Sequence, residues 1–190
     1  GGDKGIFGYG NPTSYTAVTN KVSNAGVIAS DTAGVGTARR YLAACEYGDD
    51  TAIFGFGNDS NFLAVTNLVS NAGVVADDTA GVGTVRDALA ACDYDGDKGI
   101  FAYGVDAGGN LSMSNKVSNA GVVADDVTGV GSGRSYIVAT QYDGDKGIFG
   151  YGYKAGHVGM TNLVSDTGVI ADDVSAVGTG RAGAAACSFN

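Results

Sequence analysis

The sequence predicts an all-β fold assembled from four copies of one unit of about 47 residues. Each unit consists of short aromatic and β-branched runs bounded by glycine, which is the pattern of strands and turns. Two residue types mark the period at equivalent positions, namely Ile6, Ile53, Ile100 and Ile148, and Arg39, Arg86, Arg134 and Arg181. A fixed period of this length is the signature of a repeat architecture.

Four strands are expected in each unit. In the first copy, residues 4–10 form a short aromatic strand, residues 17–22 alternate apolar and polar side chains, and residues 27–29 (Val-Ile-Ala) form a third strand. A tight turn at residues 23–26 separates the second strand from the third, because glycine and asparagine favour turns. Residues 39–47 are the fourth strand. Their alanines would also suit a helix, but the flanking tyrosines and the absence of helix caps favour a strand.

Four short strands in one unit fit one blade of a β-propeller, whose repeats typically run to about 40–50 residues. Very short links join each fourth strand to the next first strand, so these two strands are expected to form a hairpin within one blade. The sequence therefore predicts a four-bladed β-propeller with four antiparallel strands per blade. Pairing of the C-terminal strand (181–189) with the N-terminal strand (4–10) would close it. A solenoid or β-helix is the alternative, but it would need two coils per repeat and distinctive end caps.

The prediction is one domain, residues 1–190, with repeats at about 1–47, 48–94, 95–142 and 143–190. The net charge of −9 argues against nucleic acid or anionic lipid as a partner, since both are held by clustered Lys and Arg. The longest apolar stretches are too short to cross a bilayer, so no membrane insertion is expected. Cys45, Cys92 and Cys187 share one repeat position and are expected to be small, buried free thiols.

The motifs also resemble a known repeat. Ile-Phe-Gly-Tyr-Gly at 6–10, Asn-Leu-Val-Ser-Asn at 67–71 and Gly-Val-Gly-Thr at 34–37 are similar to repeats of virion and tail-associated proteins of marine bacteriophages, which are described as kelch-like propellers. The glycine-aromatic strand also resembles regulator-of-chromosome-condensation-type propellers, and the unit count resembles hemopexin-type ones, which implies a central channel with ion binding. The chain departs from true kelch repeats, because it has no Gly-Gly doublet in the matching context and no tryptophan.

A repeated Asp/Arg pair is the first candidate site. Each pair could supply a ring of charged ligands, but recurrence in every unit favours a structural ion pair or hydrogen-bond network. The pairs are Asp31 with Arg39, Asp78 with Arg86, Asp126 with Arg134, and Asp173 with Arg181.

Catalytic and metal chemistry find little support in the residues. The Asp-Gly-Asp turns at Asp95/Asp97 and Asp143/Asp145 make calcium conceivable, but hairpin turn chemistry explains them without a metal. His157 is the only histidine, so a histidine-based triad or a multi-histidine metal site cannot be built from this chain. We therefore expect no cofactor and no enzyme. The weakest alternative is a hydrolase-like propeller that uses paired aspartates.

The loop after the first strand is where the four copies differ most, at residues 11–15, 58–62, 105–110 and 153–157. These loops are expected on one side of the ring, where recognition often sits on a rigid scaffold. The candidate ligand-binding residues are Tyr15, Asn61, Phe62, Asn110, Tyr153 and His157. The prediction is a structural or adhesive binding module on a virion, a tail fibre or a cell surface, which contacts a protein, a glycan or other virion proteins. An assembly protein without a diffusible ligand is the alternative, and tolerant surface loops would also explain the variation.

Overall fold

The computed structural model describes residues 3–189, and every helix or strand assigned in that range is a β-strand. No helix that could span a membrane occurs in this range. The strands are β1 (Gly5–Gly10), β2 (Thr16–Val22), β3 (Ala43–Tyr47), β4 (Thr51–Asn58), β5 (Phe62–Val69), β6 (Ala90–Tyr94), β7 (Lys98–Ala102), β8 (Val105–Asp106), β9 (Gly109–Asn110), β10 (Ser114–Val117), β11 (Val138–Tyr142), β12 (Lys146–Gly150) and β13 (Thr161–Val164). The all-β prediction is confirmed.

Each main sheet combines the last strand of one repeat with the first two strands of the next. The strand orders are β3-β4-β5, β6-β7-β10 and β11-β12-β13, while β1 and β2 form a two-stranded sheet. All of these pairs are antiparallel. The hairpins predicted between fourth and first strands are therefore present. Their turns use a left-handed backbone, with φ of 56° at Asp95 and 76° at Gly96.

The predicted third strand is reduced to isolated bridges in each repeat. In the first repeat these bridges join Val22 to Ile28 and Thr19 to Thr32, both antiparallel. The side chains of residues 23–34 are exposed, so neither face of this segment packs against a core. The segment consequently follows the edge of β2 without forming a continuous ladder.

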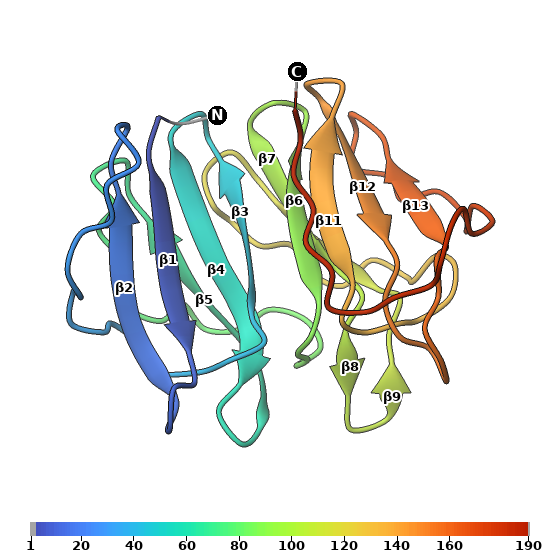
Figure 1. The fold of residues 1–190 in the computed structure, drawn as a ribbon, viewed down its shortest axis with the longest axis horizontal. Helices are drawn as coiled ribbons and strands as arrows, with labels where there is room; N and C mark the ends of the chain where they lie inside the picture. Colours follow the sequence, from blue (N-terminus) through green and yellow to red (C-terminus); the bar gives the residue numbers. More distant parts are fainter. Residues whose placement is uncertain (1–2, 190) are drawn as a thin grey trace.

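The sheets stack around a common line formed by β3, β6 and β11, with the four repeats arranged in chain order (Figure 1). Backbone hydrogen bonds connect equivalent residues across this line, from Ala88 N to Tyr41 O at 2.9 Å and from Tyr136 N to Ala88 O at 2.8 Å. A third bond of the same series joins Gly183 N to Tyr136 O at 3.0 Å. The series fixes how each repeat sits on the one before it.

Aromatic rings from neighbouring sheets meet at steep angles and contribute to the core. Phe56 packs on Phe101 with ring centroids 5.2 Å apart, and Tyr103 packs on Phe149 at 5.4 Å. Glycine gives these rings room, because a Cβ atom on Gly55 would lie 2.8 Å from Phe101 Cζ. The abundance of glycine therefore reflects close packing between sheets as well as turns.

The strand pairing predicted to close the ring is not formed in the part of the chain that the structure describes. β1 pairs with β2 alone, and residues 181–189 contain no strand. Ser188 Oγ instead accepts a hydrogen bond from Gln141 Nε2 at 3.3 Å, so this segment lies against β11. Residues 182–186 are alanine and glycine, which provide little side-chain surface to hold the segment in a sheet.

Candidate functional site

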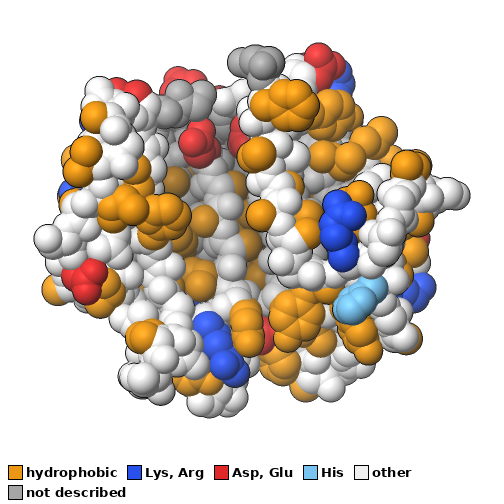
Figure 2. All heavy atoms as spheres, viewed as in Figure 1, with side chains coloured by type: hydrophobic (Ala, Val, Ile, Leu, Met, Phe, Trp, Pro, Cys, Tyr) orange, Lys and Arg blue, Asp and Glu red, His pale blue; other side chains and the backbone are white. Residues whose placement is uncertain are grey.

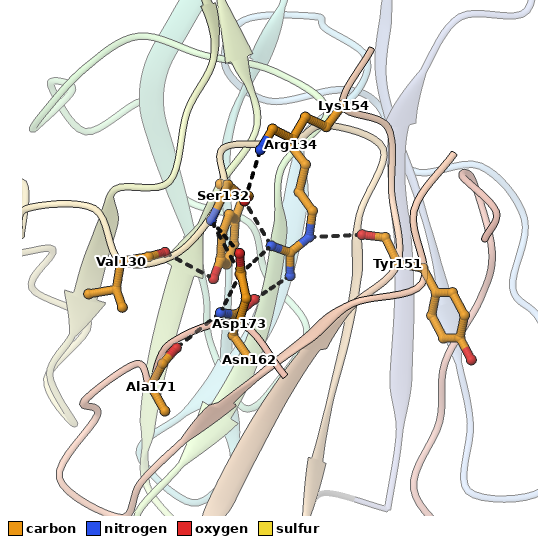
Figure 3. Close-up of polar contacts among 9 residues, drawn as sticks. Val130, Ser132, Arg134, Tyr151, Lys154, Asn162, Ala171 and Asp173 are labelled. Atoms are coloured by element: carbon orange, nitrogen blue, oxygen red, sulfur yellow. Dashed lines mark hydrogen bonds and ion pairs between the residues drawn. The ribbon is translucent and has the colours of Figure 1, made fainter. Parts of the chain in front are cut away.

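The repeated arginine is buried at the junction between two neighbouring sheets. Arg134 is fully buried, and its Nε donates to the carbonyl oxygen of Tyr151 at 2.9 Å (Figure 3). Its Nη1 donates to Ser132 O at 3.1 Å, and its Nη2 donates to Asn162 Oδ1. The same pattern surrounds Arg39 and Arg86. A buried guanidinium is tolerated here because its donors point at fixed acceptors.

The aspartate that completes each junction comes from the following repeat. Asp173 Oδ1 lies 3.6 Å from Arg134 Nη1, and Asp126 Oδ1 lies 3.9 Å from Arg86 Nη1. The prediction that Asp and Arg of one repeat pair with each other is therefore wrong. Arg134 points into the following sheet (Figure 3). It bonds there to Asn162, which in turn bonds to Asp173, so the two neighbouring repeats are linked.

Hydrogen bonds keep these aspartates ionised. Burial opposes ionisation of Asp126, but donors on Thr84 and Asn115 and the charge of Arg86 outweigh it and lower the pKa of this carboxyl. Burial is also the main reason that the pKa of Arg86 falls to about 10. Both groups stay charged at neutral pH, so the junction is an ion pair held in a hydrogen-bond network.

Arg181 belongs to the last repeat and Asp31 to the first, and neither takes part in an arginine–aspartate junction among the described residues. Arg181 is exposed, lies 3.7 Å from the ring centroid of Tyr151, and donates to Thr179 O at 3.3 Å. Asp31 is also exposed and accepts a hydrogen bond from Asn20 Nδ2 at 2.9 Å. Among the described residues, three junctions are thus complete. The arginine of the fourth repeat and the aspartate of the first repeat are left outside them.

The four variable loops leave β1, β4, β7 and β12 at the same end of the molecule, the lower end in Figure 1. Hydrogen bonds connect adjacent loops: Tyr15 Oη donates to Asn58 Oδ1 at 3.5 Å, and Asn110 Nδ2 donates to Tyr153 O at 3.2 Å. The prediction that the loops share one side is confirmed. They form the loop end, a name used below for residues 11–15, 58–62, 105–110 and 153–157.

The predicted binding residues differ in how much they offer to a partner. Tyr153 and His157 are exposed and stack edge to face with ring centroids 5.9 Å apart. Asn61 is exposed in a turn held by Asp59, which accepts from Asn61 N at 3.1 Å. Tyr15, Phe62 and Asn110 are half-buried. The structure therefore brings all six to one end, where Asn61, Tyr153 and His157 are the exposed ones.

A second group at the same end was missed by the sequence reading. Tyr41 and Tyr136 are each 44% exposed, and their rings meet edge to face at 5.9 Å. Arg40 lies over the ring of Tyr41, 4.7 Å from its centroid, and Asp87 occupies the equivalent position one repeat later. The available signal was variation among the copies at the two positions after the repeated arginine. Arg40, Tyr41, Asp87 and Tyr136 are called the mouth group below, and the surface that they form is called the mouth.

The opposite end of the inner strands encloses a cavity of about 410 Å³. Its walls include Glu46, Asp93, Gln141 and Ser188, all at one repeat position, together with the three cysteines. Burial raises the pKa of Asp93. Among the residues described, no cluster of three or more His, Cys, Asp or Glu is placed to hold a metal ion. The Asp-Gly-Asp turns instead form ion pairs, with Lys98 on Asp95 and with Lys146 on Asp143 at 2.7 Å.

The cysteines are free thiols in different environments. Cys92 is buried, and burial raises the pKa of its thiol to about 12. Burial also raises the pKa of Cys45, which packs against Gly99. Cys187 is exposed, so the prediction of a buried thiol is wrong at this position.

The chain therefore combines a repeated scaffold with a polar and aromatic contact surface. No protein-family model matches the sequence, and no curated protein matches it. The function is therefore inferred from the geometry of the loop end and of the junctions.

Proposed function

We propose that the chain is a non-enzymatic binding module that contacts a protein or a glycan through the loop end and the mouth group. The observation that carries this proposal is the concentration of unrepeated aromatic and polar side chains at one end of a repeated scaffold. Tyr41, Tyr136 and Tyr153 are exposed there, although aromatic side chains favour burial. Exposed aromatics beside amide groups suit recognition, because they offer contact area at a low cost in side-chain entropy.

The proposal includes a four-bladed β-propeller as the scaffold. Phe7 is 61% exposed, whereas its equivalents Phe54, Phe101 and Phe149 are buried by the ring of a neighbouring sheet. Tyr151 carries the ring that Phe7 would meet if the fourth sheet packed on the first. Arg181 would then face Asn20 and Asp31, as Arg134 faces Asn162 and Asp173.

Space beside the first sheet agrees with such a ring. A cavity of about 320 Å³ lies between the first sheet (β1 and β2) and the second (β3, β4 and β5), and the first sheet lacks the third strand that the other main sheets have. The face drawn in Figure 2 is hollowed in this region, between the first sheet on the left and the C-terminal segment. In the proposed ring, residues 185–189 occupy this space along β1.

Binding is tested on the purified chain with a glycan panel and with capture of proteins from a surface extract. Tyr153→Ala should weaken binding at least about tenfold, since a buried aromatic anchor at an interface typically contributes more than 1 kcal/mol. The control is Val122→Ser, because Val122 is exposed in a turn at the opposite end. Equal binding by wild type, Tyr153→Ala and a Tyr41→Ala/Tyr136→Ala double variant would overturn the proposal.

A second candidate is an assembly protein without a diffusible ligand, as in a virion or a tail fibre. The exposed apolar side chains Phe7 and Ile28 favour it, because their equivalents in the other repeats are buried or half-buried and the first sheet therefore leaves an uncovered apolar face. The resemblance of the repeats to phage proteins also supports a virion or an extracellular surface. A purified particle that contains the chain at fixed stoichiometry, with substitutions at the loop end causing no loss, would favour this candidate.

A further inference from the structure

Arg40 differs from the repeated arginines in having no acceptor for its guanidinium. Among residues 3–189, no hydrogen bond or ion pair engages its side chain, and its Nε is buried without a partner. Arg39, Arg86 and Arg134 each donate three side-chain hydrogen bonds in the same structure. The Nε is enclosed by protein, but Nη1 and Nη2 also meet no acceptor among residues 3–189, and an external acceptor would satisfy these two donors.

Aromatic rings hold the Arg40 guanidinium in place. Its Cζ lies 5.5 Å from the ring centroid of Tyr15 and 4.7 Å from that of Tyr41. Stacking on a ring fixes the plane of a guanidinium and leaves its edge for hydrogen bonds. The edge of Arg40 is therefore preorganised to receive a planar group with two acceptor oxygens, which is the geometry of a carboxylate.

The surface beside Arg40 suits the ring of a sugar. Tyr41 and Tyr136 meet across the mouth, while the equivalent positions in the other two repeats are Ala88 and Gly183. The backbone bonds between these four positions place the tyrosines on one rim, and the small residues leave the space around them free. Aromatic faces pack well against the apolar faces of sugar rings.

Asp87 is the acidic member of the mouth group. It is buried at the position of Arg40 in the next repeat, and its backbone pairs with Val105 at the base of the third loop. Burial raises its pKa, while the charge of Arg40 opposes this effect. Asp87 therefore lies beneath this surface near the charge of Arg40, and it does not itself face a ligand.

We propose that the mouth group binds the carboxylate of an acidic sugar residue, with Arg40 as the ligand of the carboxylate and Tyr41 and Tyr136 as the platform for the ring. This inference rests on the proposed binding function and names its ligand class. A glycan fits better than a peptide, because the surface offers aromatic faces and side-chain amides rather than a free strand edge. The adjoining loops contain the amide side chains of Asn58, Asn61 and Asn110, each of which makes at least one hydrogen bond within the loop end and keeps further donors or acceptors.

The test uses pairs of sugars that differ in the carboxylate. Isothermal titration compares trigalacturonate with its full methyl ester, and sialyllactose with lactose, so that uronic and sialic acids are separate arms. The acid should bind at least about tenfold more tightly than its neutral partner, since hydrogen bonds to charged groups contribute that much. The difference should shrink as salt is raised, because the mouth is open to solvent.

The variants separate the role of Arg40 from net charge and from folding. Arg40→Gln should bring the affinity for the acid down to that for its neutral partner, so that the preference for the acid is lost. Lys4→Gln makes the same change in charge at the opposite end and should have no effect. Thermal unfolding of both variants should match that of the wild type, because Arg40 contributes no side-chain hydrogen bond to the fold.

The outcomes distinguish the inference from the proposed function. Equal binding of acid and neutral sugars that Arg40→Gln does not change would overturn the acidic-sugar proposal. If Tyr153→Ala abolishes this sugar binding, the proposed binding function still stands. Absence of binding to all four sugars would overturn the inference, and protein capture would then judge the proposed function alone. Binding of an acidic peptide, lost on amidation of its C-terminus, would also overturn the inference in favour of a peptide ligand.

Discussion

The junctions and the mouth of this molecule use arginine in opposite ways. At a junction, Arg134 is fully buried, and each donor nitrogen meets an acceptor of its own repeat or of the next one. At the mouth, Arg40 is held by two aromatic rings and meets no acceptor among the described residues. The difference shows that a repeated arginine finds acceptors for its hydrogen-bond donors inside the fold, whereas the unrepeated Arg40 does not.

The largest effect is expected from removing an amide at a junction. Asn115 is fully buried and bonds to Arg86, Ala124 O and Asp126. Asn115→Ala leaves a buried charge with one partner fewer, so the free energy of unfolding should fall by about 3–5 kcal/mol. Urea denaturation checks the value.

Asn20 provides the matched control, because it is the equivalent residue in the first repeat and faces no arginine in the described structure. Asn20→Ala should cost about 1 kcal/mol or less if the first sheet is uncovered. A loss as large as that of Asn115→Ala would show that the fourth junction forms in solution, which is the arrangement proposed for the closed propeller.

A smaller effect is expected from crowding a junction between sheets. Gly55→Ala places a methyl group within 2.8 Å of the Phe101 ring, where neighbouring atoms are packed on all sides. Overpacking of this kind should lower the free energy of unfolding by about 1–3 kcal/mol. The control is Gly156→Ala in the fourth variable loop, where a Cβ atom would meet nothing within 4 Å. Equal thermal midpoints for the two variants would contradict the account of the core.

The smallest expected effect is a dependence of stability on acid pH. The pKa values of Asp78, Asp126 and Asp173 are lowered in the fold, because hydrogen bonds and the neighbouring arginines outweigh the effect of burial. A lowered pKa contributes stability that is present above the unfolded value and is lost as pH falls through the folded value. The urea midpoint should therefore be flat near pH 7 and decline below about pH 4.

Asp126→Asn tests the origin of this decline. The amide cannot ionise, so the variant should be less stable at pH 7 and should lose less of its remaining stability on acidification. A wild-type midpoint that stays constant down to about pH 3 would contradict the assigned role of the carboxylates.

Much of the scaffold could be predicted from the sequence. The period of Ile6, Ile53, Ile100 and Ile148 fixed the number of units, and the short Asp-Gly turns identified the hairpins between repeats. The partner of each arginine could not be predicted, since Asp126 is much nearer in sequence to Arg134 than to Arg86, and nearness in sequence favours the wrong pair. Only the packing of one sheet on another shows that Arg86 is the partner.

The candidate site was predicted in part for a similar reason. Variation among the copies identified the loops that contain Tyr153 and His157, and the structure brings these loops together. Tyr41 and Tyr136 were missed because they lie in a segment that otherwise reads as scaffold. Their meeting depends on the stacking of alternate repeats around one line, which no local pattern encodes.

The central claim is that repeated residues hold the scaffold and unrepeated residues do not. Urea unfolding of Arg134→Ala beside a Tyr41→Ala/Tyr136→Ala double variant tests this claim most directly. We predict a loss of about 3–5 kcal/mol for Arg134→Ala, which removes the guanidinium that links two sheets, and about 1 kcal/mol for the double variant, which removes one exposed aromatic pair. Equal losses, or a larger loss for the tyrosines, would contradict the account.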